Sequence, residues 1–358
     1  MFSAALKYFL GESTPDGFKT NFESQIKGDG FYTYILKGGP GTGKSNLIKK
    51  IALEFSDKDE LELYYCSGDP LSLDALVLKN AKTVIVDGTS PHVFDAMYPG
   101  AFQSIVNLGE CWDSDTLLKH KDEIKRLTDE NAAWHSRCKR YITAFASINS
   151  DIYSIGHSAL NIMKLSVFTS RMAKKLLPKK ESKEGEISYK KLSAITMDGY
   201  TTMPVDFYEN IIIINDPYFA AGDCFLQGIA DIAASKGYNA IVSQCCHFNS
   251  SIFEHVLIPE LKLAFLSSNP VNCIPTNQTK CINALRFYDK EYIQSKKHRI
   301  EFSRKAAEEL KKEAVLSLKN AKKIHDKMEE FYINAVDFEK VNMVAQKIIS
   351  EIYSKYKF

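Results

Sequence analysis

The sequence predicts an α/β fold built from two tandem copies of one unit, each a mostly parallel sheet flanked by helices and followed by long helices. Two observations lead to this prediction. Four blocks of the first half recur in the same order in the second half, at offsets of roughly 175 to 182 residues. In addition, an apolar β-prone run, a glycine-rich loop and an amphipathic helical pattern follow one another after residue 30.

The repeated blocks define the domain organisation. They pair residues 13–20 with 194–202, 34–52 with 212–230, 75–91 with 254–270, and 120–141 with 295–316. Four matches in one order indicate a tandem duplication, because a chance likeness between two αβ units would produce a single match. Within each unit we expect a buried strand, a loop, a helix, a second strand, an irregular segment, a third strand and long helices. The polar stretch LPKKESKEGE at 177–186 indicates a linker, which places the domains at residues 1–180 and 181–358.

The glycine-rich loop of the first unit carries a phosphate-binding pattern. Four residues meet the spacing G-x-x-x-x-G-K-[ST], between a predicted strand and a predicted helix: Gly38, Gly43, Lys44 and Ser45. Glycines let consecutive N–H groups turn toward an anion, and the helix N-terminus adds its dipole. We expect Lys44 to reach the β- and γ-phosphates and Ser45 to ligate Mg²⁺. Because the second unit repeats the first, we expect a P-loop NTPase-like fold in both. The residues predicted to bind the nucleotide are Gly38, Gly39, Pro40, Gly41, Thr42, Gly43, Lys44, Ser45 and Asn46.

A second metal-binding residue is expected after the buried run Thr83 to Val86. Asp87 follows this run, and ligands of an open parallel sheet bind beside the carboxyl ends of its strands. A carboxylate at this position holds Mg²⁺ through water, so Asp87 is predicted to be both a metal ligand, with Ser45, and a catalytic residue, with Lys44. The alternative interpretation is an Asp-Gly turn that closes the strand.

Other polar side chains are expected at the same edge of the sheet. Asp69 follows the predicted strand Leu61 to Tyr65 and is the third predicted catalytic residue, facing the γ-phosphate or a substrate. The alternative is a polar turn in which Asp69 caps a helix. His92 either binds substrate or makes a structural hydrogen bond.

The helical region after residue 115 carries two arginines on one face. Arg137 and Arg140 are three residues apart, so they lie side by side on a helix. An arginine from a helical lid can neutralise transition-state charge in phosphoryl transfer. The alternative is a solvated helix surface.

The second unit has lost the chemical groups of the loop. Alignment of the repeats places Asp216, Ala221, Gly222 and Asp223 on Gly38, Gly43, Lys44 and Ser45, with Leu266 near the position of Asp87. The lysine and the hydroxyl are gone, and two carboxylates would face the phosphates. We therefore expect a structural or regulatory pseudo-domain that binds no nucleotide.

Composition excludes several classes of protein. A net charge of +2 with no basic stripe argues against nucleic acid as a partner, and no apolar run approaches the length of a membrane span. The eight cysteines form no C-x-x-C pair and the N-terminus has no secretory pattern, so we expect a cytoplasmic protein with reduced thiols. The CCH segment at 245–247 either contributes to a metal site or holds buried cysteines at a strand end.

Four segments resemble the motifs of a known family. They are KGGPGTGKS, CSGDPLSLDA, DGTSPH and LGECWD, in that order along the chain. These segments resemble KGGPGTGKS, CSSD…SLDG, DGTxPH and LGxxWD of predicted tandem P-loop ATPases from Gram-positive, mainly clostridial-type bacteria, and the resemblance covers essentially the whole chain. It implies nucleotide binding and hydrolysis but names no substrate. The second unit of that family often keeps a recognisable P-loop, whereas this chain departs from it at every key position.

These observations lead to one expected function with two alternatives. We expect an ATPase that binds Mg–ATP at the first unit and hydrolyses it, while the second unit is degenerate. No N-K-x-D guanine-reading segment is present, which favours ATP over GTP. The alternatives are a small-molecule or nucleotide kinase, in which Asp69 contacts the acceptor hydroxyl, and a non-catalytic nucleotide-dependent scaffold. Beyond the nucleoside triphosphate, the expected partner is an unidentified small molecule or protein.

Overall fold

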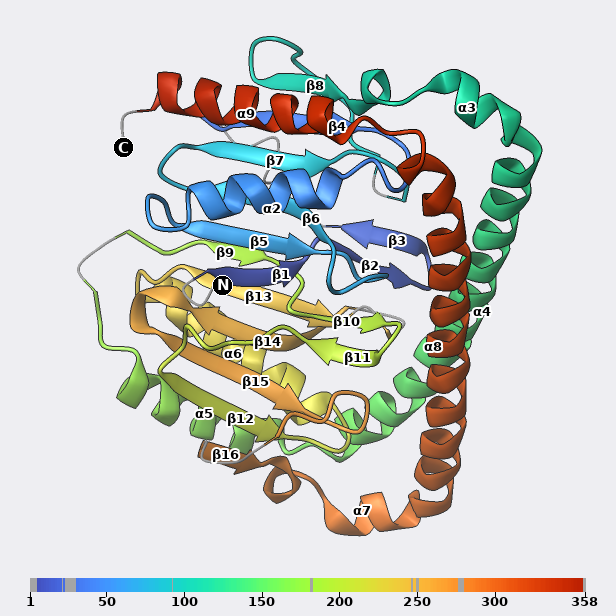
Figure 1. Cartoon of the computed structure of the whole chain (residues 1–358). Helices are drawn as coiled ribbons and strands as arrows, with labels where there is room; N and C mark the ends of the chain where they lie inside the picture. Colours follow the sequence, from blue (N-terminus) through green and yellow to red (C-terminus); the bar gives the residue numbers. More distant parts are fainter. Residues whose placement is uncertain are drawn as a thin grey trace.

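The computed structural model is a mixed α/β structure with two six-stranded sheets flanked by helices (Figure 1). It describes residues 5–20, 22, 30–91, 93–180, 183–245, 247–248, 251–275 and 280–356 of the 358. His92, Cys246 and residues 181–182 of the predicted linker lie outside the described residues. Among the residues that are described, no helix is both long enough and apolar enough to cross a membrane.

The first sheet has the strand order β1-β5-β6-β7-β4-β8. Its strands are β1 (Leu6–Phe9), β4 (Tyr32–Lys37), β5 (Leu61–Tyr65), β6 (Leu73–Leu78), β7 (Thr83–Asp87) and β8 (Gln103–Asn107). Only β6 is antiparallel to its neighbours, so the prediction of a mostly parallel sheet is confirmed. The prediction of an irregular segment between β5 and β7 is wrong. LDALVL forms the buried strand β6, because a continuous apolar run can pair on both edges in the middle of a sheet.

The second sheet repeats this topology strand for strand, with the order β9-β13-β14-β15-β12-β16. Its strands are β9 (Ile187–Tyr189), β12 (Asn210–Asn215), β13 (Ala240–Cys245), β14 (Ile252–Ile258), β15 (Leu263–Ser268) and β16 (Lys280–Asn283). Here β14 is the antiparallel strand, as β6 is in the first sheet. The two similar halves predicted from the repeated blocks are therefore present in the structure.

Each half also carries a small hairpin at its start. The hairpins are β2 (Gly11–Thr14) with β3 (Gly17–Thr20) and β10 (Ser193–Thr196) with β11 (Gly199–Thr202). Gly17 and Gly199 have φ angles of 118° and 120°, a region that is strained for residues with a Cβ. The repeated T-x-D-G segment is therefore a turn in both halves, as predicted, and its glycine is required by the backbone.

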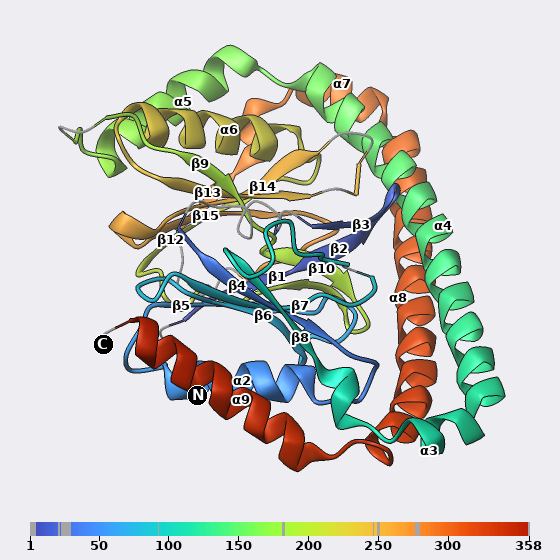
Figure 2. The same ribbon diagram turned by 90° about the horizontal axis from the view of Figure 1, so that it is seen from above.

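The two sheets pack face to face, with helices on the outer faces (Figure 2). The core between the sheets includes Ile35, Val84 and Val86 from the first and Ile213 and Leu266 from the second. On the outside of the first sheet lie α2 (Lys44–Glu54) and α9 (Phe338–Lys355), and on the outside of the second lie α5 (Ile162–Leu176) and α6 (Ala220–Ser235). The result is a four-layer arrangement of helices, sheet, sheet and helices.

Two long antiparallel helices cross this stack on one side (Figure 1). They are α4 (Lys121–Ala159), which follows α3 (Ser114–Lys119), and α8 (Lys297–Ile333), which follows α7 (Lys290–Ser295). Each carries the chain from its own sheet to the other one. As a consequence, α9 of the second half packs on the first sheet through Ile348 and Ile349, whereas α5 of the first half packs on the second sheet through Leu165 and Ala173.

The exchange of terminal helices is symmetric. Two antiparallel bridges, Trp112 with Val336 and Leu160 with Tyr288, fasten the incoming chain to the other half. Tyr288 lies 176 positions after Trp112, and Val336 lies 176 positions after Leu160 (288 − 112 and 336 − 160). The two bridges therefore join equivalent positions of the two repeats. This offset of 176 relates the helical parts of the two repeats, and it identifies equivalent positions on α4 and α8.

Buried ion pairs join the two halves. The Nζ of Lys190 lies 2.5 Å from Glu62 Oε2, and the Nζ of Lys191 pairs with the carboxylate of Glu12. Burial would raise the pKa of Glu62, but the ammonium groups of Lys190 and Lys79 outweigh burial and hold it at about 2. A buried charge left without its partner costs several kcal/mol, so these pairs fix the position of one half on the other.

Candidate functional site

The glycine-rich loop, residues 38–43, joins the end of β4 to the first residue of α2. Gly41 and Gly43 have φ angles of 70° and 82°, and Gly43 is the residue that precedes the helix. The hydroxyl of Thr42 donates to the carbonyl oxygen of Gly39 over 2.8 Å and closes the loop on itself. These glycines therefore let the backbone turn sharply into a helix N-terminus, where N–H groups are left without helical partners.

The predicted catalytic residues Lys44 and Asp87 are brought together. Lys44 Nζ donates to the carbonyl oxygens of Gly38 and Gly39, each over 2.8 Å, and lies 3.6 Å from Asp87 Oδ2. Asp87 ends β7, which pairs directly with β4, so strand order alone places its carboxylate beside the loop. The ammonium group lies across the loop beside the carboxyl end of the sheet.

The two predicted metal ligands, Ser45 and Asp87, also lie at this edge. Ser45 Oγ accepts a hydrogen bond from the backbone N–H of Leu73 over 2.9 Å. Asp87 Oδ1 accepts from the N–H of Thr89 over 2.9 Å and from its hydroxyl over 2.6 Å. The turn after β7, which was the alternative interpretation of Asp87, is therefore present together with the contact to Lys44. Asn46, the last predicted loop residue, is exposed on α2.

Asp69 makes a local turn and a long-range contact. Its Oδ1 accepts from the N–H of Leu71 over 3.1 Å, and its Oδ2 lies 3.3 Å from the Nζ of Lys322 on α8. The polar turn of the alternative interpretation is therefore present, but Asp69 caps no helix, because strand β6 follows at Leu73. The ion pair with Lys322 joins Asp69 to a helix of the other repeat, which sequence spacing did not indicate.

A further carboxylate at this edge is Asp74, the second residue of β6. It is buried, and burial together with the charge of Asp87 raises its pKa to about 8. The available signal was an aspartate in the otherwise apolar run LDALVL. Its counterpart in the second repeat is Glu254 on β14, which is also buried.

Helix α8 covers the glycine-rich loop. The N–H of Gly41 donates to Glu329 Oε1 over 3.2 Å, and a Cβ on Gly41 would lie 2.8 Å from the carbonyl oxygen of Glu329. A Cβ on Gly39 would lie 2.5 Å from the ring of Tyr332. The loop glycines therefore serve the docking of α8 as well as the turn itself.

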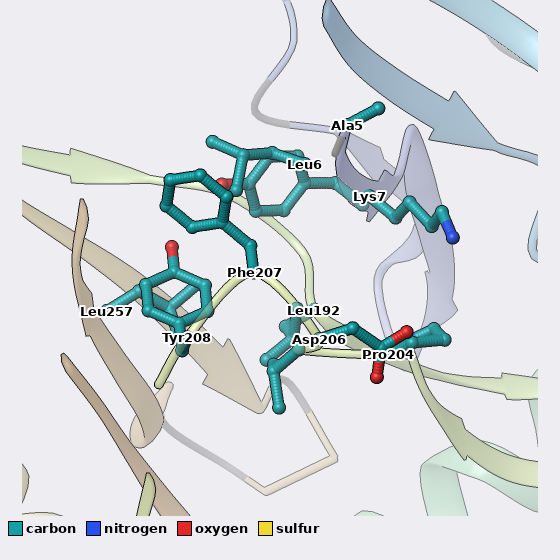
Figure 3. A pocket seen from close by; sticks show the side chains of 11 residues that line it. Ala5, Leu6, Lys7, Leu192, Pro204, Asp206, Phe207, Tyr208 and Leu257 are labelled. Atoms are coloured by element: carbon teal, nitrogen blue, oxygen red, sulfur yellow. The ribbon is translucent and has the colours of Figure 1, made fainter. Parts of the chain in front are cut away.

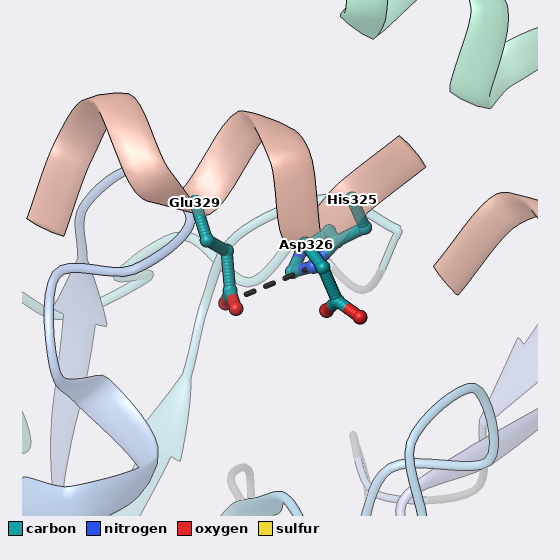
Figure 4. Close-up of side chains that lie close together, drawn as sticks. All are labelled: His325, Asp326 and Glu329. Carbon is teal, nitrogen blue, oxygen red and sulfur yellow. Dashed lines mark ion pairs between the residues drawn. The ribbon is translucent and has the colours of Figure 1, made fainter. Parts of the chain in front are cut away.

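Three ionisable side chains gather on this part of α8 (Figure 4). His325 Nδ1 lies 3.7 Å from Glu329 Oε1, and the ligand atoms of His325, Asp326 and Glu329 lie within 4.8 Å of one another. Burial lowers the pKa of His325, and the carboxylate of Glu329 opposes this shift. Only the exchange of helices brings these residues to the loop, and no local sequence signal reveals that exchange.

The equivalent loop of the second repeat is filled by its own side chains. Asp216 Oδ2 accepts from the N–H of Gly222 over 2.8 Å, and Oδ1 accepts from the N–H of Tyr218 over 3.0 Å. The Tyr288 hydroxyl donates to the Asp216 carboxylate over 2.9 Å and accepts from the N–H of Ala221 over 2.8 Å. Burial raises the pKa of Asp216, although these donors work against the rise. A carboxyl group and a phenol thus occupy the N-terminus of α6.

The other two site positions are replaced as well. Asp223 Oδ1 accepts from the N–H of Phe253 over 2.8 Å, as Ser45 Oγ accepts from that of Leu73. Strand register places Ser267 opposite Ile214, at the position of Asp87 opposite Leu36. The sequence alignment had placed Leu266 near the position of Asp87, and the structure places the next residue, Ser267, there. The hydrogen-bonded frame of the site has survived, whereas its lysine and its strand-end aspartate have not.

The remaining predicted residues lie away from the loop. Arg137 donates to the hydroxyl of Tyr141 and lies over the rings of Trp134 and Tyr141, and Arg140 donates to Ser136 on the same helix. These are contacts of a helix surface, which was the alternative interpretation. Cys245 is buried at the end of β13, as one reading of the CCH segment predicted.

A small hollow, with room for about one water molecule, lies between the halves and apart from the loop (Figure 3). It is lined by β1, by the segment 204–208 and by Leu192 and Leu257. Most of its lining is apolar, with Lys7 and Asp206 as the charged groups. We favour the loop as the functional site because a lysine, carboxylates and the N-terminus of α2 converge there.

Comparison of the chain with protein-family models, with curated proteins and with solved structures finds no match in any of the three. We therefore infer the function from the geometry of the loop and its surroundings.

Proposed function

We propose that this protein is a P-loop nucleotide-binding protein that binds Mg–ATP at residues 38–46 and hydrolyses it. The observation that carries the proposal is the position of Lys44. Its Nζ lies across the glycine-rich loop, 3.6 Å from Asp87 at the end of the adjacent parallel strand. P-loop proteins hold a nucleoside triphosphate at a helix N-terminus with a lysine, the hydroxyl of the next residue and a carboxylate at a strand end.

The side chains fit a magnesium ion. Ser45 Oγ accepts one hydrogen bond, from Leu73, and keeps a second lone pair, and Asp87 Oδ2 lies toward Lys44. Magnesium prefers oxygen ligands, which these residues supply. When bound, the ion would neutralise phosphate charge and help to orient the terminal phosphate.

The chain's own groups have distinct roles in this proposal. The loop amides and the N-terminus of α2 bind the phosphates, and Lys44 exchanges its bonds to Gly38 and Gly39 for bonds to phosphate oxygens. Asp87 holds Lys44 and the ion in position. Asp69 and Asp74 add acidic groups at the same edge, and Asp69 is the residue that we propose to face the terminal phosphate.

The second repeat is a degenerate unit in this proposal. Its loop amides are already bonded to Asp216 and Tyr288, and Gly222 stands where Lys44 would be needed. A nucleotide would have to displace the buried carboxyl group of Asp216, and no lysine is present at this position to bind its phosphates. We therefore propose one nucleotide per chain.

Phosphate release from labelled Mg–ATP by the full chain tests the activity. The proposal predicts slow release that is lost in Lys44→Ala and requires Mg²⁺. Label that appears on an added small-molecule acceptor, with no free phosphate, would indicate a kinase instead. Nucleotide binding with neither product would indicate a scaffold.

A further inference from the structure

The glycine-rich loop of the first repeat is in direct contact with a helix of the second. Gly41 donates its N–H to Glu329 Oε1, although a backbone N–H in this position is a donor that a phosphate needs. The contact is close, because a Cβ on Gly41 would lie 2.8 Å from the Glu329 carbonyl oxygen. A carboxylate of α8 thus accepts a hydrogen bond from one of the N–H groups that could bind a phosphate.

The same face of α8 also carries a cation. Lys322, His325 and Glu329 follow one another at spacings of three and four residues, so they share one face of the helix. Lys322 Nζ lies 3.3 Å from Asp69 Oδ2 and also pairs with Asp326. It is therefore held at the carboxyl edge of the first sheet by carboxylates, on a long and flexible stem.

The degenerate loop lacks this set of charges on its own covering helix. The offset of 176 places Ala146, Asn149 and Tyr153 of α4 on Lys322, His325 and Glu329 of α8. Tyr153 donates its hydroxyl to Asp223 over 2.8 Å, and Asn149 is buried. The three positions of α8 at the intact loop thus carry a lysine, a histidine and a glutamate, whereas their equivalents on α4 carry no ionised group. The charge that the degenerate loop does meet is Arg304 of α8, which donates to the carbonyl oxygen of Pro217 over 3.0 Å.

We propose that α8 of the second repeat completes the nucleotide site, with Lys322 as the residue that binds the terminal phosphate and Glu329 as the anion that the nucleotide displaces. The proposal rests on the proposed function and deepens it, because it makes one site from both repeats. Lys322 leaves Asp69 for the γ-phosphate, and the Gly41 amide leaves Glu329 for a phosphate oxygen. Triphosphates are then preferred over diphosphates.

Affinities of Mg–ATP and Mg–ADP for the full chain and its variants test this assignment. Lys322→Gln should weaken Mg–ATP binding by about tenfold or more, because a hydrogen bond to a charged group is lost. The affinity of the same variant for Mg–ADP should stay within about twofold of the wild-type value. Lys322→Arg should restore most of the preference for ATP. Glu329→Gln keeps an acceptor for the Gly41 N–H but removes the charge, and should tighten Mg–ATP binding by about threefold or more.

The matched control is Lys305→Ala, an exposed lysine on the same helix 17 residues before Lys322 (322 − 305), which should match the wild type. Equal losses for ATP and ADP in Lys322→Gln, or weaker ATP binding in Glu329→Gln, would mean that α8 only packs on the loop. A cooperative melting transition at the wild-type temperature verifies that each variant is folded.

Lys44→Ala distinguishes a failure of the proposed function from a failure of the role proposed for α8. If the wild type binds Mg–ATP, Lys44→Ala does not, and both α8 variants match the wild type, the proposed function stands and this inference is overturned. If the wild type itself binds no nucleotide, the proposed function is overturned and this inference with it.

Discussion

The Asp216 carboxylate accepts a hydrogen bond from the N–H of Gly222 over 2.8 Å, at the N-terminus of α6. The residue at the place of Gly222 in the first repeat is Lys44, and the residue at the place of Asp216 is Gly38. One substitution removes the side chain that would hold a phosphate, and the other fills the loop with an internal anion. The two changes stabilise the empty state of the second loop, because they satisfy donors that would otherwise be buried without partners.

Asp216→Ala should destabilise the protein without creating a nucleotide site. The substitution leaves the N–H groups of Tyr218 and Gly222 and the hydroxyl of Tyr288 without their acceptor, which costs about 2–4 kcal/mol. Urea denaturation measures the loss. Asp231→Ala, an exposed aspartate on the same helix, is the control and should stay within about 0.5 kcal/mol of the wild type. A stability of Asp216→Ala equal to that of the control would show that the carboxyl group does not hold the loop.

Gly222→Lys should restore no nucleotide binding to the second repeat. A Cβ at Gly222 would lie 3.2 Å from Ser267 Oγ, and the introduced ammonium would meet the carboxyl groups of Asp216 and Asp223 in place of a phosphate. The stoichiometry of Mg–ATP in equilibrium dialysis should remain one per chain. A second bound nucleotide would mean that the lysine alone had limited the site.

The buried carboxyl group of Glu254 should make stability depend on pH. Burial raises its pKa to about 7, while hydrogen bonds from Asn272 and Tyr200 oppose the rise. The folded protein then holds this proton more tightly than the unfolded chain does, so the contribution of Glu254 to stability falls as pH rises from about 4.5 to about 7.

Comparison with Glu254→Gln isolates this contribution. The free energy of unfolding of the variant minus that of the wild type should increase across the window by on the order of 3 kcal/mol and level off above it. Urea denaturation at a series of pH values measures the difference. A difference that stays constant with pH would contradict the raised pKa.

The exchanged helix α9 should stabilise the first sheet although it belongs to the second repeat. Ile348 is buried against α2 and the first sheet, so Ile348→Ala should cost about 2–5 kcal/mol. Lys347→Ala is the adjacent exposed control and should change stability little. Hydrogen exchange should accelerate in β4 and β7 more than in β12 and β15. Acceleration confined to the second sheet would contradict the exchange.

The sequence predicts much of one half and little of how the halves meet. The repeated blocks indicate two similar α/β units, and the motif places Lys44 and Asp87 at one edge of the sheet, where they lie 3.6 Å apart. These features are local or follow from the order of adjacent strands. The burial of Asp74 was not predicted, because its strand was read as an irregular segment.

The covering helix could not be predicted for a different reason. Glu329 lies 288 residues after Gly41, and the periodicity of α8 reveals which face is apolar but not which loop it meets. The bridges Trp112–Val336 and Leu160–Tyr288 join the end of each long helix to the other half. Such pairings are properties of the assembled fold, and a single sequence contains no signal for them.

Calorimetric titration of Mg–ATP into the full chain and into Lys44→Ala tests whether residues 38–46 form a single nucleotide site. We expect one nucleotide bound per wild-type chain and none in Lys44→Ala, with both proteins equally folded by circular dichroism. Two nucleotides per wild-type chain, or one that remains in Lys44→Ala, would show that the glycine-rich loop of the first repeat is not the single nucleotide site.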